Sequence, residues 1–352
     1  MSGTERPLRI ALVAPVAQRI PPERSGSIES VTALLAAGLV ARGHDVTLYA
    51  AGSSNTPAAL HATFLRGYHE DDALWPWELC ELFNIAAAVE PAKSGDRFDL
   101  IHAQAEYAPI ALAFTRLAPV PIIQTVHHWP TDPEVALWSR YPEAPFIAVS
   151  QAQARRLRGL NVAGVIHHAV DVDALPFRAT PDDYVLFLGR FTEGKGVLDA
   201  IAIARQAGQR LILAAAENDY YRDQVAPHVD GEHVLYRGEV DRAGAAALLG
   251  GARALLYPVT SDEPFGLVVA EAMACGTPVA ALHRGAVPEL IDSGVTGIIA
   301  RTPAQLADAL PAILVFDRGR VRERAIERFH PDRMVDRYLG HYTRLAFDGV
   351  RQ

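Results

Sequence analysis

The sequence predicts an α/β protein built from two doubly wound domains. Its 352 residues exceed what one hydrophobic core usually organises, so two domains are expected. Strand-like runs alternate with helical segments along most of the chain, which is the order of elements in a parallel sheet covered by helices. The runs are apolar without alternation, as in strands buried on both faces. Half of the residues are hydrophobic and 21% are charged, which suits a globular fold.

The first series of elements begins close to the N-terminus. Residues 8–15 form an apolar run, residues 28–41 have helical spacing, and residues 46–50 form the next run after Gly43. Together they make a βαβ unit. Further strand-like runs follow at residues 98–103, 121–127, 146–150 and 165–170.

A second series has strand-like runs at residues 184–189, 210–215, 234–238, 254–258, 278–282 and 297–300. Prolines and acidic residues interrupt the pattern between 170 and 182. We expect an N-terminal domain at residues 1–172, a C-terminal domain at 173–330, and a final helix at 331–352 that packs back on the N-terminal domain. Open parallel sheets bind ligands beyond the carboxyl ends of their strands, so two such domains facing each other create a cleft.

Charge and cysteine content disfavour several classes of protein. The formal net charge of −8 argues against a nucleic-acid partner, because phosphate backbones are held chiefly by dense lysine and arginine. No signal peptide is predicted, and the longest apolar stretch, residues 31–41, is too short to span a bilayer. Cys80 and Cys275 are expected to be reduced, buried thiols. These features indicate a cytoplasmic protein.

A basic stretch near the C-terminus is the exception to the acidic balance. A solvated helix face is the preferred interpretation, and weak contact with an acidic membrane surface is the alternative. The stretch comprises Arg318, Arg320, Arg322, Arg324 and Arg328.

A glycine-rich turn follows the strand predicted at 184–189. Residues 189–196 read GRFTEGKG and carry Arg190 and Lys195, and the chain's only other lysine is Lys93. Two cations on such a turn favour an anionic ligand, since each charge-assisted hydrogen bond to phosphate contributes about 1.5–3 kcal/mol. The octet also fits most of a P-loop, but Gly196 stands where a serine or threonine should bind magnesium. A nucleotide hydrolase is therefore the less favoured interpretation of this turn.

The second motif, EPFGLVVAE at residues 263–271, leads from a strand into a helix. Pro264 and Gly266 open the helix, whose exposed N–H groups can hold a phosphate. Glu263 lies before the helix and Glu271 about two turns along it. Carboxylates beside a phosphate site are unfavourable unless they accept hydrogen bonds from neutral hydroxyls, which sugars supply. Helix capping by Glu263 and solvent exposure of Glu271 are the alternative.

These motifs resemble those of glycosyltransferase family 4, which comprises retaining enzymes of the GT-B fold with two facing Rossmann-like domains. The resemblance covers nearly the whole chain and is anchored at residues 189–196, 263–279 and 285–289. It implies transfer of a hexose from a nucleotide-diphosphate sugar, UDP- or GDP-linked, with retention and without a metal or other cofactor. The implied roles are diphosphate binding by Arg190 and Lys195, sugar and phosphate binding by Glu263 and the backbone of Phe265, Gly266 and Leu267, ribose binding by Glu271, and base contact near Val240.

Two features of the N-terminal domain also match the family. Residues 21–29 resemble a PPxxxGGxE loop that reaches over the donor, with Gly26 as its first glycine and Ser27 in place of the second. Ser27 is expected to cap the helix that follows. His127, at the end of a predicted strand, matches the family's active-site histidine beside the transferred sugar.

Several alternatives stay open at this point. They are a P-loop hydrolase, a GT-B epimerase or phosphorylase, and a protein that binds sugar nucleotides without catalysis. Asp171 and Asp173 spell the DxD of metal-dependent transferases, but they lie at the domain boundary and are interpreted as structural. A dehydrogenase is poorly supported, because no GxGxxG follows residues 8–15. Nothing in residues 56–95 identifies the acceptor, which is a glycan, lipid or small molecule.

Overall fold

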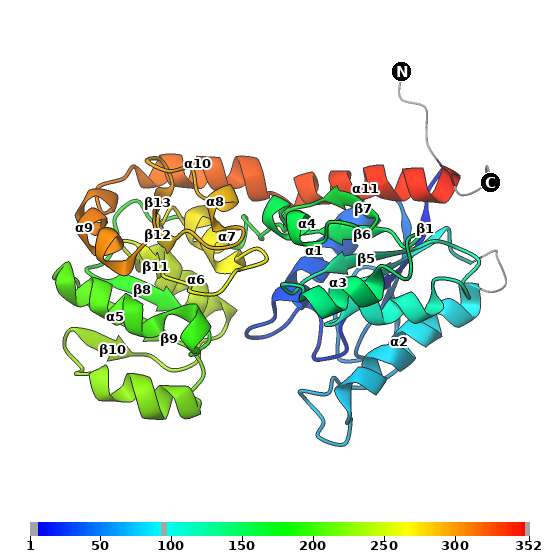
Figure 1. The fold of residues 1–352 in the computed structure, drawn as a ribbon, viewed down its shortest axis with the longest axis horizontal. Coiled ribbons are helices and arrows are strands. Elements are labelled where there is room, and N and C mark those ends of the chain that lie inside the picture. Colours follow the sequence, from blue (N-terminus) through cyan, green and yellow to red (C-terminus); the bar gives the residue numbers. More distant parts are fainter. Residues whose placement is uncertain (1–5, 93–96, 349–352) are drawn as a thin grey trace. The chain divides into compact units, whose positions relative to one another are not determined.

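The computed structural model describes residues 6–92 and 97–348, which form two compact units (Figure 1). The first unit contains the described residues up to His168 together with those from Pro331 onward, and the second contains Ala169–His330. The predicted boundary at 172/173 lies four residues after this division. Lys93 lies outside the described residues.

Seven parallel strands form the sheet of the first unit, in the order β3-β2-β1-β4-β5-β6-β7. The order reverses between β1 and β4, as in a doubly wound sheet. The strands are β1 (Arg9–Val13), β2 (Asp45–Tyr49), β3 (Ala59–His61), β4 (Leu100–Ala103), β5 (Ile122–Val126), β6 (Phe146–Ala148) and β7 (Val162–Val165). β3 was not predicted, because it has only three residues, two of them exposed, and so lacks a buried apolar run.

The strand predicted at 165–170 was wrong in position. β7 ends at Val165, and only Ile166 N continues the pairing, to Ala148 O at 2.9 Å. Val170 instead donates its N–H to Phe329 O in the second unit at 3.1 Å. The apolar residues after β7 thus belong to the connection and not to the sheet.

Helices cover both faces of this sheet. They are α1 (Ser27–Ala41), α2 (Trp77–Ala92), the 3-10 helix η1 (Ala108–Phe114), α3 (Asp132–Trp138), α4 (Gln151–Arg156) and α11 (Pro331–Asp348). Along β4, Ile101 and Ala103 pack with α2, whereas the side chain of His102 meets α11 on the opposite face.

The C-terminal helix α11 packs on α1 and β4 through two buried tyrosines. Tyr342 Oη lies 2.5 Å from His102 Nδ1, and Thr125 Oγ1 joins His102 Nε2 at 2.8 Å and Tyr338 Oη at 3.0 Å. Burial lowers the pKa of His102 to about 3, so the ring is neutral. A satisfied, uncharged network of this kind costs little to bury and gives the helix one docking register.

The sheet of the second unit has six parallel strands in the order β10-β9-β8-β11-β12-β13. They are β8 (Val185–Leu188), β9 (Leu211–Ala214), β10 (Val234–Tyr236), β11 (Leu255–Tyr257), β12 (Val279–Leu282) and β13 (Gly297–Ala300). All six fall within the strands predicted for this domain.

One face of this sheet is covered by α5 (Val197–Gln206) and α9 (Pro303–Ile313), whose apolar residues join those of the strands in a single core. The other face carries α6 (Arg242–Gly251), α7 (Leu267–Ala274) and α10 (Arg318–Phe329). Short elements lie in the connections: η2 (Glu193–Lys195), η3 (Tyr221–Val225), η4 (Ala226–His228) and α8 (Val287–Leu290).

The arginines of α10 correct the prediction of a solvated or membrane-facing basic stretch. Buried Arg318 donates to Gly250 O and Ala252 O at the end of α6, each at 2.7 Å, and Arg322 donates to Ala274 O at the end of α7. Helix ends leave carbonyl groups without partners, and guanidinium groups complement them. Arg320 is exposed, and 42% of the Arg324 side chain is exposed although it is paired.

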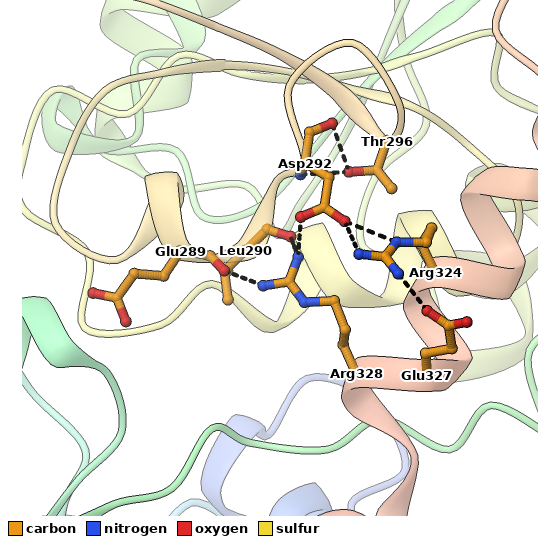
Figure 2. Close-up of polar contacts among 7 residues, drawn as sticks. All are labelled: Glu289, Leu290, Asp292, Thr296, Arg324, Glu327 and Arg328. Carbon is orange, nitrogen blue, oxygen red and sulfur yellow. Dashed lines mark hydrogen bonds and ion pairs between the residues drawn. The ribbon is translucent and has the colours of Figure 1, made fainter.

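Figure 2 shows the rest of this arrangement. Arg328 donates to Leu290 O at 2.8 Å and to Glu289 O, the last carbonyls of α8, and to Asp292 Oδ1 at 2.9 Å. Arg324 pairs with Asp292 Oδ2 at 2.8 Å. The stretch therefore ties three helix ends together inside the second unit.

Both cysteines are free and buried, as predicted. No helix in residues 6–92 and 97–348 is both long and apolar enough to cross a bilayer.

Candidate active site

The carboxyl ends of β8, β11 and β12 bring three loops to one edge of the second sheet. β8 and β11 are neighbours at the point where the strand order reverses, which is where open parallel sheets bind ligands. The loop after β8 contains residues 189–196, the loop after β11 contains 258–266, and the loop after β12 contains 283–286. The two strongest sequence motifs thus lie on adjacent strands.

The turn after β8 is held by its buried aromatic residue. Phe191 is fully buried and stacks with Phe187 and Tyr221, and Asn218 Nδ2 donates to Phe191 O at 2.9 Å. Arg190, next to it, is exposed, and we find no ion pair for it among the described residues. A rigid turn thus presents a guanidinium group to solvent.

Gly196 explains why the turn is not a P-loop. Its backbone is left-handed, with φ 71°, and a Cβ there would lie 2.0 Å from Pro258 O. A serine or threonine, which a P-loop needs for magnesium, cannot occupy this position without moving the next loop.

Lys195 and Glu263 are directly paired. Lys195 Nζ lies 2.6 Å from Glu263 Oε2, with 23% and 14% of the two side chains exposed. Tyr257, the last residue of β11, donates its hydroxyl to the same oxygen at 2.7 Å. Glu263 Oε1 has no partner among the described residues, so one carboxylate oxygen is held and the other is available as an acceptor.

The loops are also joined through their backbones. Thr260 N and Ser261 Oγ contact Gly194 O at 3.0 and 3.2 Å, which ties the β11 loop to the β8 turn. From the β12 loop, Ala286 N donates to Glu263 O at 2.9 Å and Gly285 N to Asp262 Oδ1 at 3.0 Å. The segment at 285–289, which the sequence singled out, therefore supports the backbone of Glu263.

The start of α7 provides uncommitted N–H groups. Gly266 is the N-cap residue, with φ 105° and no side-chain cap, and Leu267 begins the helix. The first N–H groups of a helix have no partner within it and favour anions. Phe265 is buried against Phe329, which fixes the chain entering α7.

Glu271 and Val240 are the remaining predicted donor-binding residues of the second unit. Glu271, on α7, is half-buried, and burial raises the pKa of its carboxyl. Hydroxyl donors would stabilise its ionised form. Val240 is half-buried in the loop between β10 and α6, one residue before Asp241, which caps α6. Their predicted roles in binding ribose and base remain predictions.

In the first unit, the prediction that Ser27 caps α1 was wrong. The helix begins at Ser27 itself, and Gly26 is the N-cap residue, without a side-chain hydrogen bond. Gly26 O accepts the N–H of Ser30 at 3.0 Å. A Cβ at Gly26 would lie 2.8 Å from both Gln18 Nε2 and Pro22 Cβ, so a larger residue at this N-cap position would clash with the loop.

His127 follows β5 and is half-buried. Its Nε2 lies 2.8 Å from Gln104 Oε1, and its ring stacks on that of His168 with centroids 5.2 Å apart. Burial, followed by the neighbouring histidines, holds the pKa of His127 well below its usual range. The ring is neutral, and its Nδ1 has no hydrogen-bond partner among the described residues.

Sequence reasoning missed three contributors to these sites. Gln104 lies one residue past β4 and contacts His127, which lies one residue past the neighbouring β5. Gln104 and His127 thus occupy equivalent positions after adjacent parallel strands. This shared position could have identified Gln104 from the sequence. Nothing in the sequence marked Tyr257 or His168. The structure brings Lys195, Glu263 and Tyr257 into contact in the second unit and places Gly26, Ser27 and His127 in the first.

Two doubly wound parallel units, with polar side chains at the carboxyl edge of each sheet, define a GT-B glycosyltransferase architecture. A family model described as glycosyl transferases group 1 matches residues 182–315, and one described as Glycosyltransferase Family 4 matches residues 28–174. The chain belongs to this family of group 1 glycosyltransferases.

Relatives and solved structures agree with this assignment. The phosphatidyl-myo-inositol mannosyltransferase of Mycobacterium leprae (strain TN) is 31% identical over 72% of this chain and 75% of its own length. That of Mycobacterium tuberculosis (strain H37Rv) is 29% identical over 98% and 99%. AviGT4, a glycosyltransferase involved in avilamycin A biosynthesis, matches with a TM-score of 0.75 and 25% identity over 97% of this chain and 98% of its own.

A further solved structure is informative about the fold alone. HepE of Anabaena, crystallised with UDP-glucose, is 18% identical with a TM-score of 0.71, over 96% of this chain and all of its own.

Proposed function

We propose that this glycosyltransferase transfers a hexose from a nucleotide-diphosphate sugar to an acceptor hydroxyl, with retention of the anomeric configuration and without a metal ion. One observation carries the proposal. Lys195, Arg190 and the start of α7 are positive groups on or next to the loops after β8 and β11, and Glu263 lies 2.6 Å from Lys195 with one oxygen uncommitted. This set matches an anionic diphosphate joined to a neutral, hydroxyl-rich group.

The residues of the second unit divide two tasks in this mechanism, stabilising the leaving group and binding the sugar. Negative charge develops on the departing diphosphate while the sugar passes through an oxocarbenium-like state. Lys195, Arg190 and the N–H groups at Gly266 and Leu267 stabilise that charge, and the loss of one such preorganised donor typically costs about 10²–10³ in rate. Glu263 Oε1 accepts a hydrogen bond from the sugar.

His127 serves the acceptor side in this proposal. Its neutral ring keeps a lone pair on Nδ1 when Nε2–H donates to Gln104, which suits a hydrogen bond from a sugar or acceptor hydroxyl. The acceptor hydroxyl attacks the sugar on the face from which the diphosphate leaves, and its proton passes to an oxygen of the leaving phosphate. No covalent enzyme intermediate forms.

Donor use and stereochemistry test the proposal together. UDP-glucose, UDP-GlcNAc and GDP-mannose are each incubated with the enzyme and candidate acceptors in excess EDTA, and the first-formed glycoside is examined by NMR. We expect one donor to support transfer at an unchanged rate in EDTA, with the donor's anomeric configuration preserved. An inverted product would overturn the retaining mechanism. Activity that EDTA abolishes and that magnesium or manganese restores would overturn metal independence.

A further inference from the structure

Tyr257 is a buried hydroxyl at the centre of the second unit's site to which the sequence analysis gave no role. It ends β11, only 5% of it is exposed, and its hydroxyl donates to Glu263 Oε2 at 2.7 Å. Lys195 Nζ contacts the same oxygen at 2.6 Å. Two donors on one oxygen fix the carboxylate plane and leave Oε1 as its free acceptor.

The two donors, Lys195 and Tyr257, differ in what else they bind and in how freely they can reorient. Lys195 is the cation that the proposed function assigns to the donor diphosphate, and a flexible ammonium group re-aims easily. Tyr257 has no such freedom. Its ring is enclosed at the end of a central strand, and a Cβ on Gly266 would lie 3.1 Å from its hydroxyl, so the start of α7 lies directly beside it.

The protonation state of Tyr257 suits a permanent hydrogen-bond donor to Glu263. Burial, followed by the neighbouring Glu263, raises the pKa of Tyr257 well above its ordinary value. The hydroxyl therefore stays protonated near neutral pH and remains available as a donor to the carboxylate.

We propose that Tyr257 is a positioning residue that keeps Glu263 oriented toward the sugar when Lys195 turns to the donor diphosphate. The inference rests on the proposed function and extends it, because it separates two parts of donor recognition. Tyr257 serves the sugar through Glu263, whereas Lys195 serves the diphosphate. Removing the Tyr257 hydroxyl should therefore impair sugar transfer and leave nucleoside diphosphate binding intact.

The first test compares Tyr257→Phe with Tyr184→Phe. Both remove a buried hydroxyl in the same unit, but Tyr184 precedes β8 at the opposite edge of the sheet and donates to Leu248 O at 2.8 Å. We expect Y257F to lower kcat about 10- to 100-fold, as for a lost hydrogen bond to a charged group. Y184F should change kcat less than about twofold while lowering the melting temperature to a similar extent. Equal effects of the two variants on kcat would overturn the inference.

A double-mutant cycle tests whether Tyr257 acts through Glu263. In the Glu263→Ala background, Y257F should change the residual kcat less than about twofold, because the group it positions is gone. A loss of kcat as large as in the wild type would show a role independent of Glu263 and would overturn the inference.

An equilibrium measurement keeps this test separate from that of the proposed function. Titrations of wild type and Y257F with UDP, GDP and their hexose conjugates give dissociation constants without turnover. We expect Y257F to weaken the hexose conjugate at least about fivefold and to leave the free nucleoside diphosphate within about twofold. Equal weakening of both would contradict the inference. Absence of transfer by the wild type, with this binding difference intact, would instead contradict the proposed function alone.

Discussion

At the scale of single residues, the site depends on close backbone approach as much as on charge. Gly285 has φ +47°, and a Cβ there would lie 2.2 Å from Glu263 O and 2.4 Å from Glu263 N. The motif that contains Gly285 therefore does not need to touch a ligand. It lets the β12 loop pack against the backbone of Glu263 and so fixes the residue that faces Lys195.

Substitution of Gly285 tests this dependence, and Gly294 provides the control. Both have positive φ, but a Cβ at Gly294 meets nothing within 4 Å. Gly294→Ala should cost about 1 kcal/mol from backbone strain and leave kcat/KM unchanged. Gly285→Ala should destabilise the protein more and lower kcat/KM at least about tenfold, because Glu263 must move. Melting curves and donor kinetics measure both effects. Equal behaviour of the two variants would contradict the proposed role of Gly285.

The sequence predicted the residue types of the site better than their contacts. Lys195 and Glu263 were each identified from a local motif, yet their 2.6 Å pairing joins positions 68 residues apart and follows only from the adjacency of β8 and β11. Ser27 was assigned a cap from propensity, whereas α1 begins at Ser27 with Gly26 as its N-cap residue, a position where Gln18 and Pro22 leave no room for a side chain.

At the scale of elements, α10 connects parts of the second unit that are distant in sequence. Its arginines donate to carbonyls at the ends of α6, α7 and α8, and Ala286, the N-cap residue of α8, donates its N–H to Glu263 O. The strands of this unit were predictable because burial on both faces gives continuous apolar runs. The role of the arginines was not predictable from the sequence. A basic helix face is taken to be solvated unless the helix ends that it contacts are known.

Arg328 and Arg320 form a matched pair on α10. Arg328 caps α8 and bonds Asp292, whereas the side chain of Arg320 is exposed, and we find no contact for it in the part of the chain that the structure describes. Arg328→Ala should lower the melting temperature by roughly 5 °C, since it removes charge-assisted hydrogen bonds to α8. Arg320→Ala should change it by less than about 1 °C. Binding to anionic vesicles should be as strong in both variants as in the wild type. A vesicle affinity that falls in R320A and R328A alike would revive the basic-surface interpretation.

At the scale of the whole molecule, the stability of the fold depends on pH through a buried acidic side chain in the first unit. In the first unit, Glu81 on α2 is fully buried and accepts the N–H of Val16 at 3.0 Å, in the loop after β1. Burial raises the pKa of Glu81 to about 8, so the carboxyl is protonated in the folded protein near neutral pH. Such a group makes folding depend on pH.

The sign of this dependence follows from linkage. The folded pKa lies above the unfolded value of 4.5, so the unfolded chain ionises first and stability falls as pH rises from about 4.5 to about 8. Glu81→Gln keeps an acceptor for Val16 and removes the titration. Its melting temperature should therefore fall less than that of the wild type between pH 5 and pH 8. Glu78→Gln, at an exposed position of the same helix, should follow the wild type. Parallel curves for E81Q and wild type would contradict the assignment.

The central claim is that the protein's own cations, and not a metal ion, bind the donor diphosphate. Calorimetric titration with the preferred nucleotide sugar in EDTA tests it most directly, using Lys195→Ala, Arg190→Ala and the control Arg210→Ala. Arg210 is exposed and precedes β9, at the opposite edge of the same sheet. We expect about 10- to 100-fold weaker binding for K195A and R190A and no change for R210A. Wild-type affinity in both K195A and R190A, or binding by the wild type only after a divalent metal is added, would contradict the claim.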